Sequence, residues 1–198
     1  MMEHIVLDLY HTCKNDKLAP NSDITPFKAR SNGKQWLGHG YYFWVESLFF
    51  AQSWGKNSDA FASTGYAVLR YRLTISRDNL LDLVGSPADQ QGILKAFELF
   101  KNGEIENARS STLAAYINWI QENNAWHWQA TKLADYGKKE SFEKHSVKIS
   151  TKGELTFLKP RIQLCVHKLS NNVDLKFQEI ITTGFSKKKK FSSYTQVK

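Results

Sequence analysis

The sequence predicts an α+β domain, and three observations support this. Strand-like segments occur near both ends of the chain, in residues 5–75 and 146–183. Helical apolar spacing is confined to the stretch between them, in residues 88–137. The 198 residues are 41% hydrophobic and 23% charged, which is typical of one globular domain with a sizeable core. We expect a single domain over residues 1–186, with a helical insertion at about 86–137 and a basic tail at 187–198.

The first part of the chain contains three predicted strands and one helix. Ile5–Tyr10, Tyr41–Val45 and Tyr66–Ile75 are rich in aromatic and β-branched residues, and the third alternates between two faces. The second strand follows Gly38-His39-Gly40, where glycine permits a tight turn or a close approach to a ligand. Ser47 is then placed to cap a helix that begins at Leu48.

The middle of the chain is predicted to be helical. Ile93, Leu94, Phe97 and Phe100 mark one apolar face, and a second face is marked by Leu113, Tyr116, Ile117 and Ile120. Trp126-His127-Trp128 and the residues up to Gly137 are expected to continue as a third helix or as a lid.

The final third returns to strands, at residues 146–150, 155–158, 161–167 and 173–183. Glu179 interrupts the last of these just before Ile180-Ile181. A carboxylate inside a strand usually has a partner or a function. The alternative interpretation is that Glu179 simply lies on an exposed face of the strand.

Several classes of protein are not indicated. No apolar run reaches the ~20 residues of a membrane span, and the N-terminus lacks the basic region of a secretion signal. Cys13 and Cys165 are too few for a disulfide scaffold, and the histidines show no metal-ligand spacing, so we expect no metal and a cytoplasmic setting. Neither G-x-G-x-x-G nor a P-loop motif is present.

The positive charge is concentrated at the C-terminal end. Residues 138–198 contain 14 Lys and Arg against 5 Asp and Glu, whereas residues 1–137 contain 13 against 14. Such a basic region favours an anionic partner, either nucleic acid or an acidic protein. The alternative is a set of solvated lysines.

Three segments together resemble the ADP-ribosyltransferases of the diphtheria-toxin and poly(ADP-ribose) polymerase type. Gly38-His39-Gly40-Tyr41-Tyr42-Phe43, with Ser47 and Ala51, is similar to that family's G-K-G-I-Y-F segment, Leu9-Tyr10-His11-Thr12 to its strand-end histidine, and Gln178-Glu179-Ile180 to its glutamate segment. The resemblance implies a split β-sandwich of two antiparallel sheets with an NAD cleft between them.

The resemblance also assigns roles to residues. His11, Tyr42 and Glu179 would form the catalytic His–Tyr–Glu set, with His11 on a ribose hydroxyl, Tyr42 stacked on nicotinamide and Glu179 stabilising positive charge on the ribose. Further NAD contacts would come from Thr12, Arg30, Gly40 and Trp54. Trp54 stands next to Ser53, which occupies the place of the family's second stacking tyrosine.

The implied activity is transfer of one ADP-ribose unit from NAD to a macromolecule. Similar small enzymes are toxins of toxin–antitoxin and phage-defence systems, so a neutralising antitoxin protein is an expected partner. The basic end favours RNA or single-stranded DNA as the acceptor, and the residues expected to contact it are Trp126, Trp128, Lys138 and Lys139. The alternatives are a protein acceptor, an NAD glycohydrolase, or a catalytically inactive member of the fold that binds nucleic acid.

Overall fold

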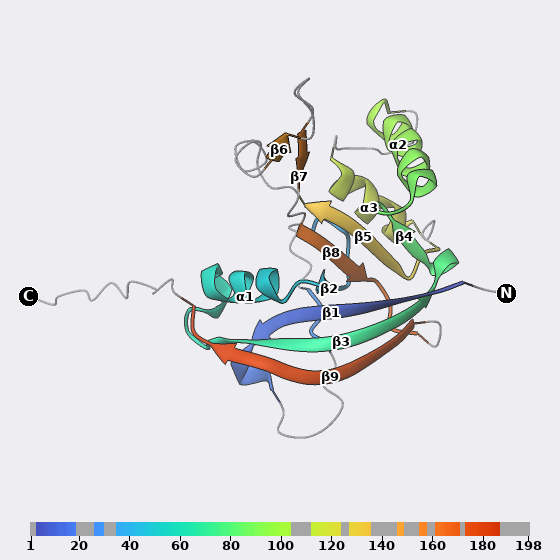
Figure 1. Ribbon diagram of the computed structural model, residues 1–198. Coiled ribbons are helices and arrows are strands. Elements are labelled where there is room, and N and C mark those ends of the chain that lie inside the picture. The colour runs from blue at the N-terminus through green and yellow to red at the C-terminus, as the bar shows by residue number, and fades with distance from the viewer. Residues whose placement is uncertain are drawn as a thin grey trace, which may run out of the picture.

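The computed structural model shows an α+β chain built on one seven-stranded mixed sheet, to which three helices are added (Figure 1). It describes residues 3–18, 26–29, 35–103, 112–123, 127–135, 146–148, 155–157, 161–170 and 173–186. The strand order is β4-β5-β8-β2-β1-β3-β9, and a separate two-stranded ribbon is formed by β6 and β7. The strands are β1 (His4–Lys14), β2 (Tyr41–Val45), β3 (Tyr66–Ser76), β4 (Leu80–Asp82), β5 (Ala130–Asp135), β6 (Ser146–Lys148), β7 (Leu155–Phe157), β8 (Arg161–Val166) and β9 (Val173–Gly184).

The sheet has one long-stranded half and one short-stranded half. Strands β1, β3 and β9 pair antiparallel over their whole lengths, and the β3–β9 pair contains two register shifts. Strand β8 pairs antiparallel with both β2 and β5, and β4 adds to β5 in parallel. Alternation in β3 is as predicted: Leu69, Tyr71, Leu73 and Ile75 are buried in the main core, whereas Arg70, Arg72 and Thr74 are partly or fully exposed.

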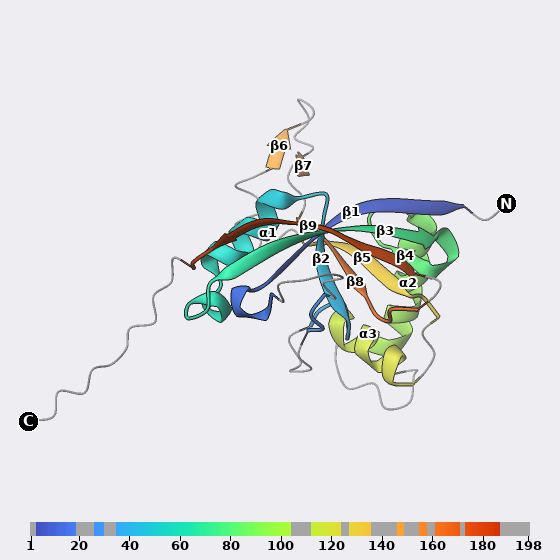
Figure 2. The same cartoon turned by 90° about the horizontal axis from the view of Figure 1, so that it is seen from below.

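The helices follow capping signals in the sequence. Ser47 begins α1 (Leu48–Asn57) by accepting a hydrogen bond from the Phe50 N–H. Ser86 caps α2 (Pro87–Lys101), in which Pro87 occupies the first turn, and Thr112 caps α3 (Leu113–Glu122). Figures 1 and 2 show α1 near the β1–β3 half of the sheet and the α2–α3 pair near the β4–β5 end.

The core is divided accordingly. The main cluster fills one face of the sheet and includes Leu9, Phe43, Leu69, Tyr71 and Leu164. A second cluster lies under α1, and a third joins α2 and α3 to β4. A fourth, small cluster places Ile117 of α3 against Leu37 and Cys165.

Two sequence expectations differ from this architecture. The expected continuation of the insertion as a helix or lid is instead strand β5, whose Ala130 and Thr131 are completely buried. The alternation in residues 130–135 is weak, and burial between β4 and β8 decides the conformation. The described residues also form one seven-stranded sheet rather than two separate large sheets.

Candidate functional site

The sheet opens between β1 and β2, and the candidate site lies at this opening. The two strands pair only at Leu9↔Val45 and Tyr10↔Trp44. Beyond Tyr10, β1 continues along β3 while β2 continues along β8. His11 is therefore the first residue of β1 that faces an unpaired stretch of β2.

The His11 side chain bonds to β2 just beyond the last residue pair of the β1–β2 ladder. Its Nδ1 lies 2.8 Å from the Tyr42 carbonyl oxygen. Because a carbonyl only accepts, Nδ1 carries the proton and Nε2 is left as an acceptor. The side chain is 6% exposed, and burial lowers the pKa of His11, so the ring is neutral near pH 7. A neutral imidazole with one acceptor nitrogen suits a hydroxyl group of a ligand.

A short segment crosses the opening and occupies that acceptor position. The Phe27 N–H donates to His11 Nε2 at 3.3 Å, and the Phe27 and His11 rings are 6.1 Å apart. Two residues later, the Ala29 N–H donates to the Gly40 carbonyl at 2.9 Å. The segment thus joins β1 to the start of β2 through two backbone donors. A ligand hydroxyl that bonds to Nε2 has to replace only the long Phe27 contact.

Tyr42 is fixed through its hydroxyl rather than through its ring. The hydroxyl accepts from the Leu37 N–H at 2.9 Å and donates to the Gly38 carbonyl at 2.8 Å. Gly38 has a φ of +82°, which is why glycine is needed there. Burial raises the pKa of Tyr42 far above its usual value, so the phenol stays protonated. The ring itself is half-buried and packs against the cluster of Leu37, Ile117 and Cys165.

The turn before Tyr42 is held by helix α3. Gln121 Oε1 accepts the His39 N–H at 2.9 Å, while Gln121 Nε2 lies 2.7 Å from His167 Nδ1. Two contacts of His167 Nδ1 require opposite tautomers, because the Gln121 amide nitrogen donates at 2.7 Å whereas the His39 carbonyl, 3.2 Å away, only accepts. We assign Nδ1 as the acceptor from the shorter contact, which directs the Nε2–H to Thr131 Oγ1, 2.8 Å away. Burial lowers the pKa of His167 to about 4. The insertion is therefore connected directly to the glycine turn.

The structure brings the His11 ring to the backbone carbonyl of Tyr42, but the side chains lie on opposite faces of β2: His11 packs on Phe43, whereas the Tyr42 ring packs on the cluster of Leu37, Ile117 and Cys165. Glu179 is placed elsewhere. Residues opposite one another run across the sheet in a single row: Gln163 (β8), Trp44 (β2), Tyr10 (β1), Arg70 (β3) and Glu179 (β9). Three strand spacings of about 4.8 Å put Glu179 roughly 14 Å from β2. Its carboxylate is half exposed and pairs with Arg70, with Glu179 Oε1 3.2 Å from Arg70 Nη1. Arg70 also pairs with Asp8 at 2.8 Å.

Gln163 is the polar residue that lies beside Tyr42. Tyr42 is opposite Cys165, so Gln163 is its diagonal neighbour on the same face, about 7–8 Å away by strand geometry. Gln163 Oε1 accepts from the Trp36 indole N–H at 3.1 Å. Sequence reasoning missed this residue. The signal was a glutamine in an otherwise apolar strand, Ile162-Gln163-Leu164.

The other predicted NAD contacts lie in different settings. Thr12 donates its hydroxyl to the Ala51 carbonyl at 2.8 Å, which ties the end of β1 to α1. Gly40 packs so tightly that a Cβ there would be 2.4 Å from the Val166 carbonyl oxygen. Trp54 lies on α1 with 54% of its surface exposed. Arg30, Trp126, Lys138 and Lys139 lie outside the described residues.

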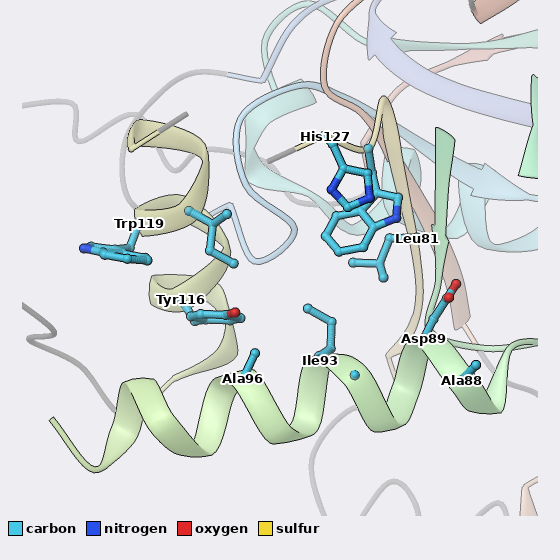
Figure 3. A pocket seen from close by; sticks show the side chains of 11 residues that line it. Leu81, Ala88, Asp89, Ile93, Ala96, Tyr116, Trp119 and His127 are labelled. Atoms are coloured by element: carbon cyan, nitrogen blue, oxygen red, sulfur yellow. The ribbon is translucent and has the colours of Figure 1, made fainter. Parts of the chain in front are cut away.

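Trp128 lines a separate pocket between α2 and α3, with a volume of about 330 Å³. Figure 3 shows side chains from α2 and α3 on facing sides and the His127–Trp128 segment above them. Apart from Asp89, Tyr116 and His127, the lining is apolar, tryptophan or glycine. The residues are Leu81, Ala88, Asp89, Gly92, Ile93, Ala96, Tyr116, Trp119, Ile120, His127 and Trp128.

Comparisons with known proteins add no assignment. No family model, no curated protein and no solved structure matches the chain. Within the described residues, no group of three or more His, Cys, Asp and Glu side chains is placed to hold a metal ion. No helix in the described part of the chain is long and apolar enough to cross a membrane.

Proposed function

We propose that this protein is an NAD-dependent mono-ADP-ribosyltransferase of the split β-sandwich type, with NAD bound at the opening between β1 and β2. The observation that carries the proposal is the 2.8 Å contact between His11 Nδ1 and the Tyr42 carbonyl oxygen. The ring of one residue that the family resemblance selected contacts the backbone of the other where the sheet divides. In this proposal, the division separates the two halves of the sandwich.

The residues at the opening fit the chemistry of NAD. His11 Nε2 would accept a ribose hydroxyl after the Phe27 N–H withdraws, and the half-buried Tyr42 ring would stack on the nicotinamide. The backbone of Thr12, at the same end of β1, would bond the carboxamide. Trp54 would close the other side of the ring only after α1 or its side chain shifts, since it is more than half exposed on the helix.

Cleavage of the nicotinamide–ribose bond develops positive charge on the ribose, as in glycoside cleavage. A group fixed beside that charge, accepting hydrogen bonds from the ribose hydroxyls, stabilises the transition state. The sequence nominates Glu179 for this role. The fold nominates Gln163, whose amide oxygen lies on the strand next to Tyr42. In both versions nicotinamide leaves with the bonding electrons, and an acceptor atom forms the new bond to the ribose while losing its proton.

The charge distribution supports a nucleic-acid acceptor. The excess of Lys and Arg in residues 138–198 would draw a polyanion to the protein. RNA or single-stranded DNA offers base nitrogens as nucleophiles. An antitoxin protein that neutralises the enzyme, as in toxin–antitoxin and phage-defence systems, belongs to the same proposal.

The proposal is tested by incubating the purified protein with nicotinamide-labelled NAD and separate RNA, DNA and protein pools. Released nicotinamide and ADP-ribose on one pool are the expected results. The variants Glu179→Gln and Gln163→Ala then separate the two assignments. A loss of turnover of about a hundredfold in only one of them identifies the stabilising group. Unchanged turnover in both would refute the mechanism.

One observation favours a second candidate function. The residue beside Tyr42 is an amide, and the predicted carboxylate is held by Arg70 about three strands away. An amide carries no negative charge, so the opening would bind NAD or nucleic acid without turnover. Binding of NAD with no release of nicotinamide, and equal RNA affinity with and without Glu179, would establish this alternative.

A further inference from the structure

The pocket between α2 and α3 has the chemistry of a ring-binding site, and the proposed catalysis at the β1–β2 opening does not use it. Its volume of about 330 Å³ is at the lower end of the range for small-molecule sites, and would hold one planar base with part of its sugar. Tyr116 and Trp119 of α3 contribute aromatic surface on one side. His127 and Trp128 contribute a second aromatic surface, with ring centroids 3.9 Å apart.

The polar groups of the pocket differ in how they are used. Asp89 is already engaged, because its Oδ2 accepts from Arg77 Nη2 at 2.9 Å and from the Asp82 N–H at 2.8 Å. Tyr116 is not. Its side chain is 94% buried, since 6% is exposed, yet its hydroxyl makes no hydrogen bond to any described residue. Figure 3 shows this hydroxyl directed toward the centre of the pocket. The hydroxyl oxygen is not among the described buried polar atoms that lack a partner, so it is accessible from the pocket and available to bond to a ligand atom.

Gly92 is an exposed residue of α2 that lines the pocket. A Cβ built there would meet nothing within 4 Å. A glycine in the middle of a helix lowers its stability relative to alanine. Here neither a positive φ nor a close contact requires glycine, so the open space itself is the remaining explanation.

We propose that this pocket binds one unpaired base of a single-stranded nucleic acid. Aromatic walls stack any base without regard to sequence, and the Tyr116 hydroxyl would donate to a ring nitrogen or carbonyl oxygen of the base. The excess of Lys and Arg in residues 138–198 would attract such a polyanion to the protein. This inference rests on nucleic acid being the acceptor of the proposed reaction, and it places the recognition of the acceptor on the insertion.

The glycine provides the test. Gly92→Leu fills the pocket from a position that has free space, and Gly92→Ala is the matched control that removes the glycine but leaves most of the cavity. Both substitutions are expected to raise the melting temperature, so a loss of binding cannot be attributed to unfolding. A third variant, Tyr116→Phe, removes only the hydroxyl.

The measurement is fluorescence anisotropy of labelled single-stranded RNA and DNA of about 12 nucleotides, a length within the range of known single-strand sites. It is made at two salt concentrations, because salt weakens the phosphate contribution and leaves the stacking contribution. We expect Gly92→Leu to weaken binding at least about tenfold at both salts, Gly92→Ala to stay within about twofold, and Tyr116→Phe to lose about three- to tenfold.

Wild-type affinity in Gly92→Leu would overturn the proposal and leave charge alone as the source of binding. Failure of the wild-type protein to bind either oligonucleotide would overturn it as well. Nicotinamide release is measured on the wild type and the same variants with the RNA, DNA and protein pools present. If no variant releases nicotinamide but the binding pattern holds, the base site stands and the transferase proposal fails. If nicotinamide is released normally but the expected binding pattern of the variants is absent, the transferase proposal stands and the base site fails.

Discussion

The His11 imidazole donates from Nδ1 to the Tyr42 carbonyl oxygen at the point where β1 and β2 separate. A side chain therefore replaces a backbone donor at the end of a ladder, while its second nitrogen accepts from the Phe27 N–H. This one ring satisfies two backbone groups, one on β2 and one on the segment that crosses the opening. The residue selected as a ligand-binding histidine is thus also a structural link.

The substitution His11→Leu should destabilise the protein. It would leave the Tyr42 carbonyl and the Phe27 N–H without a partner near a buried side chain, and each such group costs about 1–3 kcal/mol. Urea unfolding should show a free energy of unfolding lower by about 2–4 kcal/mol, with His127→Gln as a control at an exposed histidine. A stability equal to that of the control would mean that the ring has no structural role.

The stability of the protein should fall as the pH is lowered from 6.5 to about 4. Burial lowers the pKa of His167 from 6.5 to about 4, and it also lowers the pKa of His11. Between these values the unfolded chain binds protons that the native protein does not, so the free energy of unfolding rises with pH. His167 contributes a slope of about 1.4 kcal/mol per pH unit inside this window and no slope above it, and His11 adds a slope of the same sign below pH 6.5.

The measurement is the urea midpoint at pH 4.5, 5.5, 6.5 and 7.5 for the wild type and for His167→Gln. The variant should show a shallower dependence below pH 6.5 and the same flat region above it. An unchanged slope in the variant would show that His167 does not titrate as its burial requires. The exposed histidine His127 again supplies the control substitution.

Much of the fold could be predicted from local patterns, and most of the site could not. Aromatic and β-branched runs identified strands at 5–10, 41–45 and 66–75, and Ser47 identified the start of α1. Strand β5 was missed because burial between β4 and β8, rather than alternation, determines it.

The placement of Glu179 depends on strand order, which alternation within one strand does not encode. Its pattern predicts a carboxylate on a strand, and the structure has it there, but β9 pairs with β3 and not with β2. The neighbour of β2 is β8, so the same reasoning applied to the correct pair leads to Gln163. Gln163 lies on the strand next to β2, whereas Glu179 lies three strands away from β2, and the sequence alone does not give this strand order.

Gln121 should hold the turn that positions Tyr42. Gln121→Ala removes both the acceptor of the His39 N–H and the donor to His167 Nδ1. We expect a loss of about 1–3 kcal/mol in stability and faster hydrogen exchange at the amides of His39 and Leu37, whose N–H bonds to the Tyr42 hydroxyl. If these amides exchange as slowly in the variant as in the wild type, the contact of α3 with the turn does not stabilise the turn.

A matched variant, Gln121→Glu, tests the contact between Gln121 and His167. A carboxylate still accepts the His39 N–H, but its other oxygen faces the lone pair of His167 Nδ1, so protonation of that nitrogen becomes favourable. The pKa of His167 should therefore rise from about 4. Titration of the imidazole followed by NMR measures this, and an unchanged pKa would mean that the side chain at position 121 does not contact His167.

Two glycines with opposite surroundings should respond in opposite directions to alanine. Gly92→Ala adds a methyl group in free space on α2 and should stabilise the protein by about 0.5–1 kcal/mol. At Gly38, φ is +82° and a Cβ would be 2.4 Å from Gln121 Oε1, so Gly38→Ala should destabilise it by more than about 1 kcal/mol. Part of that cost should disappear in Gly38→Ala combined with Gln121→Ala, because the clashing amide is then absent, whereas the cost of the backbone conformation remains. The free energies of unfolding are measured with urea. If the losses in the two single variants add up to the loss in the double variant, Gln121 does not clash with a side chain at position 38.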